Sequence, residues 1–270
     1  MVNTWNYFNM GTQKNISLVA EKLGLHLWQV ENTIRLLEDG STIPFISRYR
    51  KEMTGSLDEV KLLHIRDEYN RLKELDIRRE SIIRSIEEQD KMTPELRQKL
   101  EAATRMSEIE DLYLPFRPKR RTRATIAKEK GLEPLASLIM EQGETDPGKK
   151  AEEFLGDSVA DKGEALAGAC DIIAEWISED QKARARLRIL FEREAVISSK
   201  VVRGKEQEGI KYSDYFDWSE PLRKCPSHRL LAMRRGEEEG FLRLSVLPED
   251  EKAIDILKSL FIKGRNESSR

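Results

Sequence analysis

The fold is decided by residues 57–89, LDEVKLLHIRDEYNRLKELDIRRESIIRSIEEQ, which contain neither glycine nor proline. Apolar residues recur in this stretch at spacings of mostly three or four, the period of one helix face. They are Val60, Leu63, Tyr69, Leu72, Leu75, Ile82 and Ile86. Ser56, with Glu59 three residues later, matches a capping box. The stretch therefore predicts one helix of roughly 50 Å, long enough to project from the domain or to brace other helices along its flank.

Shorter elements are predicted on both sides of this spine helix. Capping residues, glycine and proline delimit further helices from residue 17 to residue 194. After Ala195, β-branched runs predict strands at 195–203, 212–216 and 241–246, with helices at 227–235 and 249–261. We therefore expect a mainly α fold, an elongated multi-helix module with one long spine helix and a small α/β segment at the C-terminal end. The predicted divisions are a flexible tail at 1–15, a helical domain at 16–194 and the α/β segment at 195–270.

Composition excludes several classes of protein. Charged residues make up 36% of the 270 residues, against roughly 25% in an average globular protein. No apolar run approaches the roughly 18 residues that a membrane span needs. The two cysteines cannot form a disulfide framework, and the first residues lack the features of a secretory signal. We expect a cytoplasmic protein with no membrane association.

One segment concentrates positive charge although the net charge of the chain is only −2. Five basic residues lie around Pro118, directly before a predicted helix that starts near Ala124: Arg117, Lys119, Arg120, Arg121 and Arg123. Arginine forks match phosphate geometry, and a helix N-terminus adds backbone donors. The segment is therefore a candidate phosphate-binding loop. The alternative is internal pairing with acidic helix faces, such as Glu87, Glu88, Glu108, Glu110 and Asp111.

Two further features are weaker candidates for nucleic-acid contacts. Arg48, Arg50 and Lys51 form a short basic group, as do residues 223–235, and a solvated polar face explains either group as well. Ala20, Gly24 and Val30 have the spacing of a helix-turn-helix, in which a small residue lets two helices cross and glycine turns the chain. A packing hairpin satisfies the same spacing.

The sequence offers no constellation for catalysis. The three histidines lie far apart, none with a partner at helical spacing that indicates a metal site. Cys-x-x-Cys, a phosphate-binding glycine loop and a nucleophile elbow are all missing from the sequence. We expect a protein that is not an enzyme and that needs neither metal nor cofactor.

Four motifs resemble the bacterial transcription accessory protein Tex family. The longer two are NTIRLLEDGSTIPFISRYRKEMTG at 32–55 and EDLYLPFRPKRRTRATIA at 110–127; the shorter are AEWISED at 174–180 and PSHR at 226–229 with RGE at 235–237. The resemblance extends from about Ile16 to Gly264. It implies a cytoplasmic, nucleic-acid-binding protein that works with RNA polymerase.

Family members are much longer and continue into an RNase-H-like domain, helix-hairpin-helix units and an RNA-binding OB-fold, so we expect an N-terminal fragment or a truncated member. The resemblance supports the basic motif at 117–123 but assigns no role to its individual residues. Our expectation is a non-catalytic, nucleic-acid-associated transcription accessory protein that contacts RNA or DNA phosphates. The alternative is a helical scaffold that docks downstream domains or RNA polymerase without binding nucleic acid itself.

Overall fold

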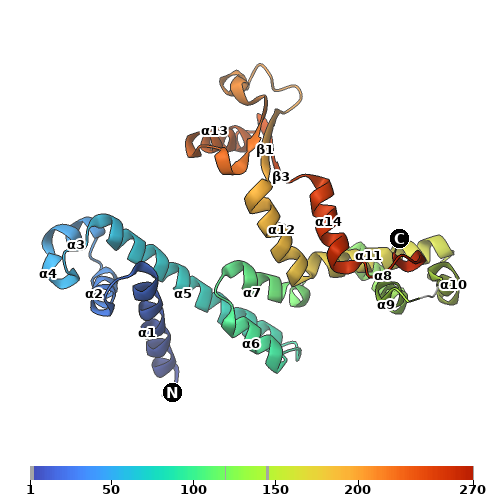
Figure 1. Ribbon diagram of the computed structural model, residues 1–270, viewed down its shortest axis with the longest axis horizontal. Coiled ribbons are helices and arrows are strands. Elements are labelled where there is room, and N and C mark those ends of the chain that lie inside the picture. Colours follow the sequence, from blue (N-terminus) through green and yellow to red (C-terminus); the bar gives the residue numbers. More distant parts are fainter. Residues whose placement is uncertain (1–2, 119, 144–145, 270) are drawn as a thin grey trace. The chain divides into compact units, whose positions relative to one another are not determined.

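The computed structural model describes residues 3–118, 120–143 and 146–269. The chain forms two compact units, residues 1–116 and 117–270. Helices dominate both units (Figure 1), and the predicted mainly α fold class is confirmed. The division follows Phe116, where Pro115 and Pro118 interrupt helix formation. The composition change at Ala195 lies inside the second unit.

The first unit is built around α5 (Glu59–Glu87), the predicted spine helix, which is about 44 Å long at 1.5 Å per residue. It contacts α1, α2, α3, α6 and α7, so it braces its neighbours along its flank. The other elements are α1 (Asn3–Leu23), α2 (Leu27–Glu38), α3 (Ile43–Tyr49), α4 (Lys51–Thr54), α6 (Pro94–Ala102), α7 (Met106–Tyr113) and the 3-10 turn η1 (Leu114–Phe116).

The start of α5 differs from the predicted capping box. Ser56 has a left-handed backbone, with φ of 61°, and Asp58 is the cap, whose carboxylate accepts the amide of Lys61 at 2.8 Å. Leu62 and Ile65 are buried here, whereas Val60 is 60% exposed and Leu63 is also exposed. Two sets of apolar residues at helical spacing overlap in this first turn. The packing of α1, α2 and α3 decides which set is buried, and the later predicted positions from Tyr69 to Ile86 are buried as expected.

Helix α1 begins at Asn3, well before Ser17, where the sequence suggested the first helix. No proline lies before Ser17 and the single glycine there, Gly11, stays inside the helix. The flexibility of residues 1–15 stays a prediction. Ile16, Val19 and Ala20 of α1 are buried against α2 and α5.

The second unit begins with a helical layer. It contains α8 (Arg123–Glu129), α9 (Glu133–Glu141), α10 (Pro147–Ala151), η2 (Glu152–Phe154), α11 (Lys162–Glu179) and α12 (Gln181–Glu194). Alanines dominate the core between α8, α9 and α11. A Cβ atom on Gly168 would lie 2.4 Å from Cδ1 of Leu132, so glycine at this position permits the close approach of α11 to the end of α8.

An antiparallel sheet follows α12, with strand order β2-β1-β3. Strands β1 (Val196–Val201) and β3 (Leu242–Leu247) confirm two of the predicted strands. The third strand of the sheet is β2 (Asp217–Pro221). The predicted strand at 212–216 is wrong, because these residues belong mostly to the 3-10 turn η3 (Ile210–Tyr215). Tyr212 of this turn is buried, with its ring centroid 6.1 Å from that of Phe241. The remaining elements are η4 (Leu222–Lys224), α13 (Ser227–Glu238), α14 (Asp250–Phe261) and η5 (Glu267–Ser269).

Candidate nucleic-acid interface

The arginines of the predicted phosphate-binding loop face solvent. Arg117, Arg120, Arg121 and Arg123 are all exposed, and the side chains of Arg121 and Arg123 are 68% and 86% exposed. Lys119 lies outside the described residues. Each described guanidinium group in the loop is therefore open to an anion from solution.

The ion pairs that these arginines make are few and exposed. Arg121 Nη2 lies 2.7 Å from Glu129 Oε2, and Arg123 Nε lies 3.5 Å from Asp171 Oδ1. Within the described ranges, neither Arg117 nor Arg120 has a hydrogen-bond or ion-pair partner. Exposed pairs of this kind contribute about 0–1 kcal/mol each, so they compete weakly with a phosphate.

Several acids proposed as internal partners of the loop have other roles. Glu110 forms a two-point ion pair with Arg78, at 2.6 and 3.2 Å. Glu87 pairs with Arg97, and the Glu108 carboxylate accepts backbone amides at the start of α7. These three carboxylates are therefore engaged within the first unit.

The start of α8 holds the loop in place. Thr122 caps the helix, and its hydroxyl accepts the amide of Thr125 at 3.0 Å. This amide is therefore already occupied, contrary to the expectation that it is a free donor for phosphate. Lys128 pairs with Glu175 of α11 at 2.7 Å, and Lys130 pairs with Glu164. The hydrogen bond from Lys130 lowers the pKa of the Glu164 carboxyl. These two lysines fasten α8 to α11, while the arginines before them remain exposed.

A small open groove of about 200 Å³ lies between α8 and α11 beside this loop. Its lining includes Arg123 and Lys130 opposite Glu164 and Asp171, above the apolar side chain of Ile126. Since both signs of charge line the groove, its net potential is weak. The exposed arginines carry the positive charge of this region.

The second predicted basic group lies in the other unit, at the junction of α3 and α4. Arg48, Arg50 and Lys51 are exposed, and the Arg50 guanidinium lies 5.6 Å from the centre of the Phe45 ring. In the described part of the chain we find no carboxylate paired with any of the three. The structure therefore leaves this group accessible.

The helix-turn-helix candidate has the contacts of a packing hairpin. Gly24 has φ of +62° at the turn, and Ala20 and Val30 are buried. Gln29 Nε2 donates to the Thr54 carbonyl at 3.2 Å, and Asn32 Nδ2 donates to the Met53 carbonyl at 2.9 Å. Because these two polar side chains of α2 bind α4, they are unavailable for reading bases.

The basic group at 223–235 divides into structural and exposed members. Arg229 Nη1 pairs with Glu220 at 2.7 Å, and its guanidinium lies 4.8 Å from the centre of the Trp218 ring. The hydrogen bond from Arg229 lowers the pKa of Glu220. Arg229 thus fastens α13 to β2, whereas Arg223 and Lys224 are exposed.

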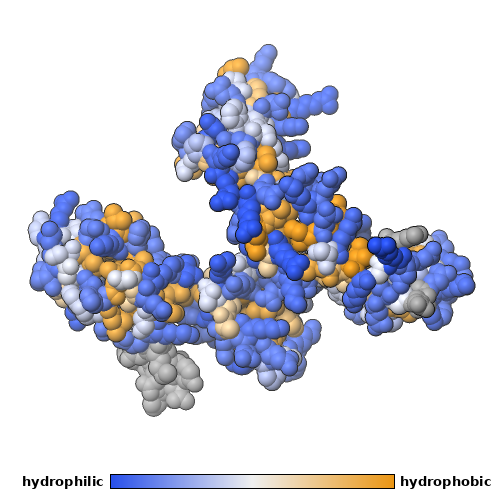
Figure 2. All heavy atoms as spheres, in the orientation of Figure 1, coloured by the Kyte–Doolittle hydropathy of each residue, from blue (hydrophilic) through white to orange (hydrophobic). Residues whose placement is uncertain are grey.

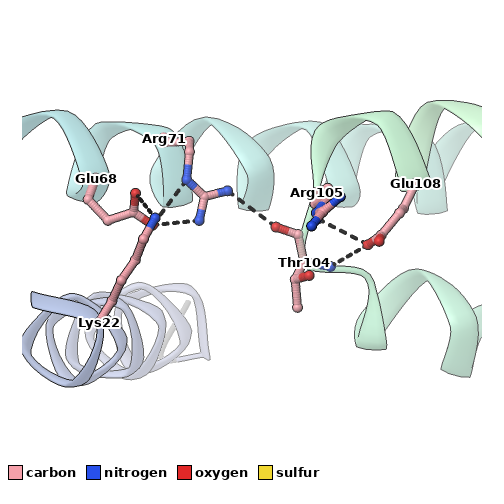
Figure 3. Close-up of polar contacts among 6 residues, drawn as sticks. All are labelled: Lys22, Glu68, Arg71, Thr104, Arg105 and Glu108. Carbon is pink, nitrogen blue, oxygen red and sulfur yellow. Dashed lines mark hydrogen bonds and ion pairs between the residues drawn. The ribbon is translucent and has the colours of Figure 1, made fainter. Parts of the chain in front are cut away.

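Basic residues of α5 also have a structural role (Figure 3). Arg71 Nη2 lies 2.6 Å from Glu68 Oε1, while Arg71 Nη1 donates to the Thr104 carbonyl at 3.2 Å. Lys22 of α1 contacts the same Glu68 carboxylate at 2.6 Å. The hydrogen bond from Arg71 is the largest cause that lowers the pKa of Glu68. The Glu68 carboxylate therefore joins α1 to α5, and Arg71 extends the contact to the Thr104 carbonyl just before α7.

A second basic surface was missed by the sequence analysis. Lys182, Arg186 and Arg193 of α12 are exposed, and none has an ion-pair partner among the described residues. A signal was present in the sequence, because no acid lies three or four residues from Arg186 or Arg193. The loop cations lie close together in the sequence, whereas these three cations are four and seven positions apart and lie together only on the helix surface.

The described ranges of the chain also bear on metal binding and on membrane spanning. No three His, Cys, Asp or Glu residues there are placed to hold a metal ion. No helix in those ranges is long and apolar enough to cross a lipid bilayer.

These features define a class of protein: a mainly α module with a small antiparallel sheet and exposed cationic segments. Residues 13–87 match the Tex-like protein N-terminal domain, and residues 142–266 match the Tex central region-like domain. The chain belongs to the Tex family and represents its N-terminal part.

Individual relatives agree with this assignment. The chain is 44% identical over 229 residues to the transcriptional accessory protein Tex of Neisseria gonorrhoeae, covering 85% of this chain and 30% of that protein. It is 45% identical over 233 residues to protein tex of Bordetella pertussis, covering 86% of this chain and 30% of that protein. It is 28% identical over 247 residues to S1 RNA-binding domain-containing protein 1 of Homo sapiens, covering 86% of this chain and 24% of that protein. The chain thus spans less than a third of the length of these relatives.

Proposed function

We propose that this chain is a non-catalytic, nucleic-acid-associated part of a cytoplasmic transcription accessory protein. The Arg117–Arg123 loop contacts the phosphates of RNA or DNA. The observation that carries this proposal is the exposure of the loop arginines, two of which lack any ion-pair partner in the described chain. The names of the bacterial relatives support the transcription role, and the name of the human relative supports the nucleic acid.

The chemistry follows from the guanidinium groups. Each offers a planar fork of donors that fits phosphate oxygens, and each contact releases a counterion from the nucleic acid. Binding should therefore be independent of base sequence and should weaken steeply with salt. Arg121 and Arg123 exchange an exposed carboxylate partner for a phosphate, while Arg117 and Arg120 bind without losing one.

A fluorescence anisotropy titration tests the proposal. Labelled single-stranded and duplex oligonucleotides are titrated with the chain at about 50 and about 200 mM salt, a range over which phosphate contacts weaken strongly. The variant Arg117→Gln/Arg120→Gln/Arg123→Gln should bind at least about a hundredfold more weakly at the lower salt, with a salt slope reduced by about three. Equal affinities for the variant and the parent chain would contradict the loop assignment.

A matched control removes the same charge elsewhere in the second unit. Lys150, Lys162 and Lys205 already pair with Glu153, Glu152 and Glu208. Their combined replacement by glutamine should leave the affinity nearly unchanged. An equal loss in this control would mean that net charge, rather than the loop, governs binding.

A second candidate function is the docking of a protein partner such as RNA polymerase. Leu247, Ile254 and Ile262 are exposed around α14, and Figure 2 shows an orange apolar patch over α12 and α14. Apolar residues gathered on a surface are typical of interaction sites. Retention of RNA polymerase by the immobilised chain, and its loss in Ile254→Asp, would favour this function over phosphate binding.

A further inference from the structure

The exposed cations of α12 lie on one side of the helix. Lys182, Arg186 and Arg193 are separated by four and seven residues. At 3.6 residues per turn these spacings place all three within roughly 40° of one another around the axis. Ala183 and Leu190 are buried, so they define the packed side of α12. We refer to Lys182, Arg186 and Arg193 as the α12 stripe.

The two arginines of the stripe have little compensating charge around them, whereas Lys182 has Glu179 three residues before it. Residue 189, between Arg186 and Arg193 on the same side, is isoleucine and is 48% exposed. Glu194 lies farther around the helix and pairs with Lys252 of α14 at 2.7 Å. Arg188 has Glu192 four residues later, but neither Arg186 nor Arg193 has an acid at such a position. Figure 2 shows deep blue, strongly hydrophilic side chains along α12 beside the apolar patch.

The length of the stripe fits a run of phosphates. Eleven residues separate Lys182 from Arg193, or about 16 Å along the axis at 1.5 Å per residue. One strand of a duplex carries a phosphate about every 3.4 Å of axis, so the stripe faces four or five consecutive phosphates. The long side chains of lysine and arginine can adjust to such a row.

We propose that the α12 stripe is a second phosphate-backbone site, which binds a nucleic acid strand without regard to its base sequence. It rests on the proposed association of the chain with nucleic acid but not on the Arg117–Arg123 loop. Arg186 and Arg193 donate their forks to phosphate oxygens, and Lys182 supplies a point charge at the start of the helix. The exposed Ile189 contacts the sugar between two phosphates.

A nucleic acid strand, with its regular row of phosphates, suits the stripe better than a folded acidic protein does. Two of the three cations are arginines, whose geometry suits phosphates. They follow a straight axis for about 16 Å, as a nucleic acid backbone does. We therefore argue for nucleic acid, and an acidic protein becomes an outcome of the test.

The test compares two triple variants of the full chain. Lys182→Gln/Arg186→Gln/Arg193→Gln should weaken binding to a labelled oligonucleotide at least about a hundredfold at about 50 mM salt, and should reduce the salt slope by about three. The control Lys150→Gln/Lys162→Gln/Lys205→Gln removes equal charge and should bind like the parent chain. Circular dichroism melting should give nearly the same Tm for both variants and the parent, because the replaced stripe residues have no partners in the described structure and the control lysines lose only exposed ion pairs.

The outcomes separate this inference from the proposed function. A weakened stripe variant supports the inference, whatever the loop variant does. An unchanged stripe variant overturns it, while weakening of the loop variant alone keeps the proposed function. A parent chain that binds no oligonucleotide overturns both. Polyglutamate that binds the parent but not the stripe variant, while oligonucleotide binding is unchanged, would assign the stripe to an acidic protein partner.

Discussion

Helices α5 and α12 are both rich in arginine, yet they use it differently. In α5 the guanidinium groups of Arg71, Arg78 and Arg79 bind carboxylates and, for two of them, backbone carbonyls of neighbouring segments. In α12 the stripe binds nothing among the described residues. Net cation content therefore does not distinguish a structural helix from a binding helix. The position of the nearest acid or carbonyl distinguishes the two kinds of helix.

The same comparison applies to the shorter basic segments. Lys128 and Lys130 fasten α8 to α11 through Glu175 and Glu164, whereas Arg117 and Arg120, a few residues earlier, are exposed and unpaired in the described chain. A single basic run thus contains both roles. The boundary falls where the extended, proline-containing segment ends and the helix begins.

The largest loss of stability is expected when Arg79 of α5 is replaced, so this variant tests most directly whether the arginines of α5 are structural. Its Nε and Nη2 donate to the carbonyls of Leu100 and Ala103, at 2.9 and 2.8 Å, and it also pairs with Asp76. Arg79→Met should lower the free energy of unfolding by about 3 kcal/mol, because hydrogen bonds from a charged group contribute about 1.5–3 kcal/mol each. Urea unfolding followed by circular dichroism measures the change. A loss below about 1 kcal/mol would show that the α5 pairs are incidental.

Replacement of Glu68 has the next largest effect. Glu68→Gln should cost about 1–2 kcal/mol, because Lys22 and Arg71 both lose their carboxylate partner. The pKa of Glu68 is lowered in the folded chain, so its stabilising contribution is complete above the unfolded pKa and is lost as pH falls through the folded pKa. The difference in the free energy of unfolding between the parent and Glu68→Gln should therefore become smaller as the pH is lowered. Glu74→Gln, at an exposed position of α5, is the control and should change the free energy of unfolding by less than about 0.5 kcal/mol at neutral pH.

A carboxylate placed within the stripe should convert α12 into a helix like α5. Ile189 lies three residues after Arg186 and four before Arg193, so Ile189→Glu provides a partner for both. Stability should rise by about 0.5 kcal/mol from two helical pairs, while oligonucleotide affinity should fall severalfold. Ile189→Gln is the uncharged control. If both variants lower affinity equally, Ile189 acts through its apolar contact rather than through charge.

The smallest effect is expected for Arg186→Met, the same replacement as at Arg79 but on α12. The free energy of unfolding should change by less than about 0.5 kcal/mol, as for most surface substitutions, because Arg186 has no described partner to lose. Parallel urea curves for Arg79→Met and Arg186→Met give the contrast directly. A comparable loss at both sites would remove the distinction between the two helices.

Local sequence predicted the elements well where one pattern was dominant. The uninterrupted stretch after Asp58 gave the spine helix, and two β-branched runs gave β1 and β3. The prediction failed at residues 212–216, where aromatic residues typical of strands pack as a 3-10 turn around buried Tyr212. It also misplaced the first buried turn of α5, because two apolar registers overlap there.

The candidate site was harder to predict than the fold. The cluster of cations at 117–123 was visible in the sequence, and the exposure of its four arginines agrees with the binding hypothesis. The spacing of Ala20, Gly24 and Val30 also fits a helix-turn-helix, yet Gln29 and Asn32 of α2 bind the carbonyls of α4. The α12 stripe forms no cluster in the sequence, because its three cations are spread over twelve residues.

The amino-acid sequence by itself determined where helices form and end, since these depend on glycine, proline, caps and periodicity within a few residues. It also determined the family, through motifs at 32–55 and 110–127. Only the tertiary structure decided which cations are free, because an arginine's partner can lie far along the chain, as Glu110 does for Arg78. Charge is a property of a residue, but its availability depends on the groups that folding brings within a few ångströms.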